Sequence, residues 1–142
     1  MKKTNSKRGF TIIEALMASV LIAIAISALI AANTAMSNVN AAGANLSTAE
    51  YLLQQVRERT ETTGYQYLRN MYNDKVYSPP VDEDGDELTA FNAYSQHIGV
   101  AYVANDNFDE TVDEDEGFLK ITAEVRYNGE PITSSSWIRA EY

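Results

Sequence analysis

The sequence of 142 residues contains no cysteine, and its three prolines all lie at or beyond Pro79. The lack of cysteine excludes disulfides, thiol nucleophiles and cysteine-ligated metal sites. The lack of early proline allows one long helix in the first half of the chain. Charge is also missing from a long stretch, because residues 15–32 contain no acidic or basic side chain.

Basic residues are scarce outside the N-terminus. The formal net charge is −9, with 11 basic and 20 acidic residues, and four basic residues lie within the first eight positions. A chain cut after Gly9 would keep 11 − 4 = 7 basic residues against 20 acidic ones, a net charge of −13. Because nucleic-acid binding requires clustered Lys and Arg, this balance argues against nucleic acid as a partner.

The apolar run is long enough to span a bilayer. A membrane-spanning helix needs about twenty apolar residues, and residues 10–32 contain a single charged side chain, Glu14. The basic cluster before the run predicts a cytoplasmic N-terminus, with the rest of the chain outside. A secretory signal peptide cleaved after Ala42-Gly43-Ala44 and a plain membrane anchor are the alternatives. Neither alternative explains Glu14, since a carboxylate in a bilayer core costs about 2.5 kcal/mol or more.

Residues 7–16, Lys-Arg-Gly-Phe-Thr-Ile-Ile-Glu-Ala-Leu, resemble the class III signal of type IV pilins and type II secretion pseudopilins. The resemblance covers residues 1–35 and implies that a prepilin peptidase cuts between Gly9 and Phe10. It also implies N-methylation of the new amino group of Phe10. In a filament of parallel helices, that cationic amine would pair with Glu14 of a neighbouring subunit and fix the register of the helices.

The sequence beyond the span continues as an amphipathic helix. Small or apolar residues recur every three or four positions, and together they define one stripe: Ala35, Val39, Ala42, Leu46, Ala49, Leu53 and Val56. We expect the helix to end near Thr63, with Gly64 as its C-terminal stop. A separate coiled-coil helix is the alternative interpretation of the stripe.

The remaining sequence predicts a small antiparallel sheet. A short helix is expected within residues 65–72, and a strand begins near Gln96. A second strand covers residues 118–127, where apolar and polar side chains alternate. Asn128-Gly129 predicts a two-residue hairpin, and the returning strand covers about residues 132–142. The fold class is therefore α+β and pilin-like, with a long N-terminal helix packed on an antiparallel sheet.

The expected domains follow from these patterns. Residues 1–9 are a leader that is removed, and residues 10–32 are the membrane-spanning half of the helix. Residues 33–63 are its amphipathic half, and residues 64–142 form a globular domain outside the cytoplasm.

Two acidic clusters are the candidates for a metal site. Asp82, Asp84 and Asp86 alternate as in a calcium loop, but the glycine is misplaced for an EF-hand. The second cluster, residues 106–116, has no regular ligand spacing. Some pseudopilins bind calcium in a loop, yet no motif here matches theirs, so we expect no metal and no cofactor. His97 is the only histidine, and no residue set resembles an active site, so we expect no enzymatic activity.

The resemblance implies a filament subunit in the inner membrane and later in a periplasmic or cell-surface filament. Its expected partners are other pilin or pseudopilin subunits, prepilin peptidase, and an assembly platform protein with its ATPase. The sequence is most similar to minor pilins and to I-type minor pseudopilins, while Glu14 argues against the tip pseudopilin type. A major pilin and a single-pass anchored binding or adhesion module that never polymerises are the alternatives.

Overall fold

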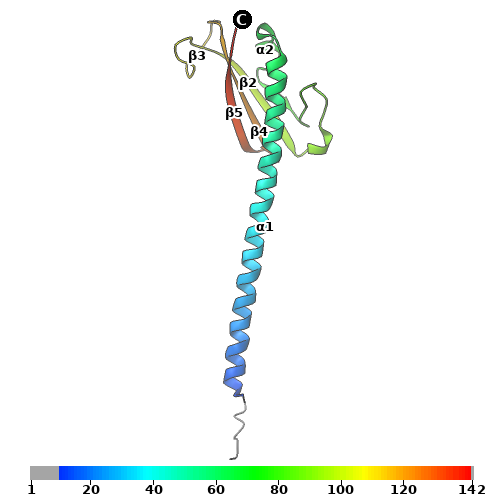
Figure 1. Cartoon of the computed structure of the whole chain (residues 1–142), viewed down its shortest axis with the longest axis vertical. Coiled ribbons are helices and arrows are strands. Elements are labelled where there is room, and N and C mark those ends of the chain that lie inside the picture. The colour runs from blue at the N-terminus through cyan, green and yellow to red at the C-terminus, as the bar shows by residue number, and fades with distance from the viewer. Residues whose placement is uncertain (1–9, 142) are drawn as a thin grey trace, which may run out of the picture. The chain divides into compact units, whose positions relative to one another are not determined.

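The computed structural model describes residues 10–141. The elements in chain order are α1 (Ile12–Thr62), α2 (Tyr65–Tyr72), β1 (Lys75–Tyr77), the 3₁₀ helix η1 (Thr89–Phe91), β2 (Tyr94–Val103), β3 (Thr111–Val112), β4 (Phe118–Tyr127) and β5 (Glu130–Ala140) (Figure 1). This architecture confirms the predicted pilin-like α+β class. Contacts divide the chain into one unit that ends at Ala41 and a second that begins at Ala42, and α1 contributes residues to both.

The second unit contains an antiparallel sheet with the strand order β1-β2-β4-β5, in which β3 also pairs with β2. The predicted hairpin is confirmed, because Tyr127 lies opposite Glu130 and only two residues connect β4 to β5. Both connecting residues have positive φ, 50° at Asn128 and 87° at Gly129, as a type I′ turn requires.

The face of the sheet that packs against α1 and α2 carries the apolar side chains predicted for β4. Leu119, Ile121, Ala123 and Val125 are at most 1% exposed. The largest cluster joins residues of both helices and two strands: Val56, Tyr65, Leu68, Tyr72, Ile98, Val100, Leu119, Ile121 and Ala123. Trp137 of β5 packs against this cluster, so the side of β5 that carries Trp137 faces the core.

The structure corrects the buried stripe on α1. Leu52 is fully buried with Ala49 and Val56, whereas Leu53 is only half-buried and Leu46 is 43% exposed. The buried face also includes the polar side chains of Gln55 and Thr60. The strict three-and-four spacing was therefore wrong by one position at Leu52, because contact with Tyr94 and Val125 of the sheet decides which side of the helix is covered.

A buried amide joins the sheet, a loop and α1. Gln96 is 0% exposed. Its Nε2 donates hydrogen bonds to the carbonyl oxygens of Leu52 (2.9 Å) and Val81 (3.0 Å), and its Oε1 accepts one from the Val81 amide (2.9 Å). Gln55 Oε1 accepts a further bond from the Glu83 amide (3.1 Å). These two glutamines hold the loop around Val81 against the helix.

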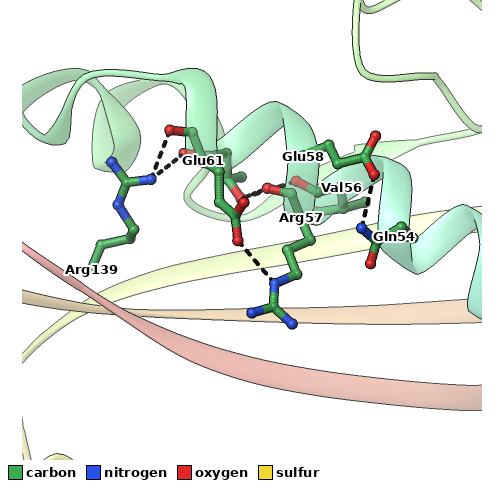
Figure 2. A network of polar contacts seen from close by, with 7 residues as sticks. Gln54, Val56, Arg57, Glu58, Glu61 and Arg139 are labelled. Atoms are coloured by element: carbon green, nitrogen blue, oxygen red, sulfur yellow. Dashed lines mark hydrogen bonds and ion pairs between the residues drawn. The ribbon is translucent and has the colours of Figure 1, made fainter.

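The end of α1 lies within one residue of the predicted end, but the conformation of Gly64 differs from the expected C-terminal stop. The helix ends at Thr62, and Gly64 has φ −62° and ψ 140°, so it is not the left-handed stop that was expected. Arg139 of β5 instead donates from Nη1 to the carbonyl oxygen of Glu61 (2.8 Å), as Figure 2 shows. A cationic donor satisfies the free carbonyls and interacts favourably with the negative end of the helix dipole.

Replacement of the buried amide gives the first testable prediction. Gln96→Leu would leave the Val81 amide and carbonyl without partners, and we expect a loss of about 2 to 4 kcal/mol in the free energy of unfolding. Urea unfolding of the detergent-solubilised chain, followed by the fluorescence of Trp137, measures this loss. Gln54→Leu is the control, since Gln54 is exposed and bonds only Glu58. Equal stability of the two variants would contradict the assigned role of Gln96.

Candidate processing and assembly site

The start of α1 is set by a reciprocal pair of side chains. Thr11 precedes the helix, and its carbonyl oxygen accepts the first helical hydrogen bond from the Ala15 amide (3.1 Å). Its hydroxyl oxygen accepts a bond from the Glu14 amide (3.3 Å). Glu14 Oε2 in turn lies 3.5 Å from both the amide nitrogen and the hydroxyl oxygen of Thr11. This arrangement is a capping box, in which both side chains satisfy amides at the helix start.

The capping box places the carboxylate of Glu14 where the helix dipole favours negative charge. Its contacts to Thr11 are long, so the two oxygens keep most of their capacity to accept hydrogen bonds from another group. Sequence reasoning singled out Glu14 but missed Thr11. The signal was present, because Thr-x-x-Glu before an apolar run is the sequence pattern of a capping box.

The polar side chains deeper in the apolar run are satisfied within the helix. The Ser19 hydroxyl donates to the carbonyl oxygen of Leu16 (2.7 Å), and the Ser27 hydroxyl donates to that of Ala23 (2.8 Å). Among the described residues, α1 is the one helix that is long and apolar enough to cross a membrane, and none of its apolar stretch is buried inside the structure. Glu14 is therefore the one ionisable group that this stretch would carry into a bilayer.

Comparison with known families finds a match to the prokaryotic N-terminal methylation motif over residues 4–30. This motif is typical of type IV pilins and pseudopilins. The match covers the capping box and most of the apolar run, so the chain is prepilin-like at its N-terminus. No curated protein and no solved structure matches the chain.

The class III signal implies processing by a prepilin peptidase, anchoring in the inner membrane and assembly with pilin subunits. Members of the pilin family are structural proteins without enzymatic activity. Gly9, the predicted residue before the cut, lies outside the described residues together with the leader. Phe10, the predicted new N-terminus, is 75% exposed.

The first acidic cluster forms a turn closed by its own backbone. Asp82 Oδ1 accepts hydrogen bonds from the amides of Asp84 (3.1 Å) and Asp86 (2.8 Å), so this oxygen is already occupied. Gly85 has φ 93°, and a Cβ there would lie 3.0 Å from Nη2 of Arg59. Within residues 10–141, the structure places no three acidic or histidine side chains together as a metal would require. The weak candidates Asp82, Asp84 and Asp86 therefore gain no support.

The second acidic cluster is tied to the rest of the unit by two side-chain contacts. Asp109 accepts a hydrogen bond from Lys120 Nζ (2.8 Å), and this bond lowers the pKa of the Asp109 carboxyl. Asp115 accepts one from the Tyr65 hydroxyl (2.5 Å). Burial, and then this bond to a carboxylate, raise the pKa of Tyr65 well above its ordinary value. The cluster thus acts as an ordered acidic loop fastened to α2 and β4.

His97 lies on the face of β2 that points away from the helices, and its Nε2 is 3.1 Å from the Ser95 hydroxyl. It pairs across the sheet with Glu124, which forms an ion pair with Arg126. The imidazole therefore has a hydrogen-bonding neighbour on its own strand and a carboxylate opposite it on β4.

The raised pKa of Tyr65 predicts a pH dependence of stability. In the unfolded chain Tyr65 loses its proton near pH 10, whereas the folded chain retains it. The unfolded state then binds fewer protons, so this contribution to stability is complete below about pH 10 and is lost as the pH rises further.

Urea unfolding midpoints between about pH 8 and 11 test this expectation. Tyr65→Phe should be less stable than the parent chain at neutral pH and should lose less stability on the alkaline side. Tyr67→Phe is the control, because Tyr67 is 56% exposed on the same helix. An alkaline loss in Tyr65→Phe as large as in the parent chain would refute the assignment.

Proposed function

We propose that this chain is a structural subunit of a type IV filament, assembled through its N-terminal helix. The observation that carries the proposal is a carboxylate at the start of α1, before a stretch without charge over residues 15–49 and inside a matched methylation motif. Cleavage between Gly9 and Phe10 creates an amine at the end of that helix. In the filament, the methylated amine of one subunit pairs with Glu14 of its neighbour.

Pairing makes two costly charges tolerable in an apolar core. An isolated carboxylate or ammonium group in hydrocarbon carries a desolvation penalty that only a close partner offsets. A helix shifted along its neighbour leaves one charge of each kind without a partner. The pair therefore selects one axial register more than it adds net stability.

The proposed layout has residues 1–9 removed and residues 10–32 in the membrane before assembly. Residues 33–63 continue the helix, and residues 64–142 form the domain outside the cytoplasm. Twelve more acidic than basic residues lie from Ala42 onward, 19 against 7, which suits a domain displayed to water.

Among filament subunits, a minor pilin or an I-type minor pseudopilin fits best. The chain has no cysteine to bridge a C-terminal loop, and its sheet ends in the short β4–β5 hairpin. Both features favour this type over a major pilin, which remains the second candidate. The proposed partners of this chain are prepilin peptidase, other pilin or pseudopilin subunits, a platform protein and an assembly ATPase.

The processing step predicts a defined N-terminus. Mass spectrometry of the chain purified from membranes that contain a prepilin peptidase should find N-methylated Phe10 as the first residue. Gly9→Val should retain Met1, since the residue before the cut is no longer small. Intact Met1 in the parent chain would contradict the proposal. A start at Asn45 would instead identify a secretory signal peptide.

The register role of Glu14 predicts that removal of its charge blocks filament entry but not processing. Glu14→Ala and Glu14→Gln should both be inserted and cleaved but enter filaments at most at about a tenth of the parent level, the loss that corresponds to one modest ion pair. Shear fractionation followed by immunoblotting measures filament entry.

Thr11→Val is the matched control, because it removes the capping partner of Glu14 and keeps the negative charge. We expect Thr11→Val subunits to enter filaments near the parent level. Normal entry of Glu14→Gln would show that the hydrogen-bonding shape of the side chain matters and that its charge does not, and would overturn the pairing.

A further inference from the structure

Strand β5 occupies an open edge of the sheet. It pairs with β4 on one side, and within residues 10–141 no strand pairs with its other side (Figure 1). Ser134, Ser135 and Ser136 in its middle are exposed. An open edge strand presents unpaired backbone amides and carbonyls that can template pairing with another chain.

The register identifies which backbone groups face outward. The Glu141 amide donates to the Gly117 carbonyl oxygen (2.9 Å), so odd-numbered residues at this end of the chain bond β4. Antiparallel strands alternate in this respect, and the pairing is regular from Thr133 to Ala140. The residues that direct their amides and carbonyls away from β4 are therefore Ser134, Ser136, Ile138 and Ala140.

Few of the usual protections occur along this part of the edge. Natural sheets block open edges with proline, lysine or bulges. Here Pro131 and the irregular pairing at Val125 and Arg126 affect only the beginning of β5. From Ile132 to Ala140 there is no proline or lysine. Arg139, the one charged residue of that run, directs its guanidinium to the end of α1.

The opposite edge of the sheet is formed by short strands. It consists of β1, with 3 residues, and β3, with 2 residues. Between them, the outward amide of Val100 donates to Asn73 Oδ1 (3.2 Å). A second copy of this chain therefore offers no complementary edge as long as Ser134–Ala140. Antiparallel pairing of two β5 strands about a two-fold axis would bring Glu130 of one copy and Glu141 of the other to the same end of the pair, where their like charges repel.

The charges around β5 indicate the chemistry of the partner. The run from Ile132 to Ala140 contains no acidic residue, although the chain has 20. Glu130 and Glu141 lie at its two ends. We propose that the β5 edge binds an extended segment of a different protein, as an added strand that is uncharged in its centre and carries Lys or Arg at both ends. Backbone pairing supplies the affinity, and the terminal glutamates select basic flanks.

A synthetic peptide tests this proposal on the full chain in detergent micelles. The peptide alternates threonine and valine over the length of Pro131–Ala140 and has a lysine at each end, so that the two lysines lie opposite Glu130 and Glu141. Hydrogen exchange followed by NMR should find the amides of Ser134, Ser136, Ile138 and Ala140 unprotected in the free chain and protected on saturation. Fluorescence anisotropy of the labelled peptide gives the affinity.

Variants of Ser136 separate edge pairing from other binding. Ser136→Pro removes one outward amide without touching the β4 ladder, and proline is tolerated on edge strands. It should weaken peptide binding by about tenfold, the effect of one lost hydrogen bond of ordinary strength. Ser136→Ala keeps the amide and should bind as the parent does. A peptide with glutamate at each end should bind more weakly than the lysine peptide.

Three results would overturn the proposal. The first is unchanged exchange of the four outward amides at saturating peptide. The second is equal affinity of Ser136→Pro and Ser136→Ala, with folding of each verified by the fluorescence of Trp137. The third is protection of the same amides without peptide that grows with protein concentration, which would make a second copy the occupant.

Discussion

The packing of the second part of α1 against one face of the sheet is the contact on which the rest of this unit depends. Val56 packs in the larger cluster with residues of α2, β2 and β4, and Leu52 packs in the smaller one with Tyr94 and Val125, so the helix contributes to both clusters of the core. Gln96 and Arg139 then tie the sheet to the helix backbone itself. The same helix therefore serves as the core of a folded unit and, earlier in its sequence, as an apolar surface left uncovered.

Because the first part of α1 is apolar and uncovered, the carboxylate of Glu14 within it bears on how the helix is used. An exposed apolar helix is costly in water and stable in a bilayer, whereas a carboxylate has the opposite preference. The capping contact with Thr11 satisfies local amides but does not neutralise the charge. A cation brought by another group can do that, and the proposed cleavage before Phe10 would create one. The chemistry at the helix start thus points to a neighbouring subunit.

The sequence predicted those elements whose conformation depends on residues that are close together in the chain. Alternation gave β4 its correct bounds, and Asn128-Gly129 gave the hairpin, because positive φ at two successive positions is a local requirement. Long-range contacts decided the rest. Arg139, 78 residues along the chain from Glu61, replaced the expected glycine stop. The methylation motif could be recognised from the sequence because its residues are contiguous in the chain. The open edge of β5 could be identified only from the strand order of the sheet.

The distribution of charge connects the two proposed contacts. No charged residue lies between Glu14 and Glu50, and no acidic one lies from Ile132 to Ala140. Elsewhere the acidic loops are held in place, by Lys120 and Tyr65 in one case and by the turn at Asp82 in the other. Ordered negative charge opposes non-specific association between domains. Residues 15–49 of α1 and residues 132–140 of the β5 edge contain no acidic residue, and these are the two surfaces at which we propose different kinds of partner.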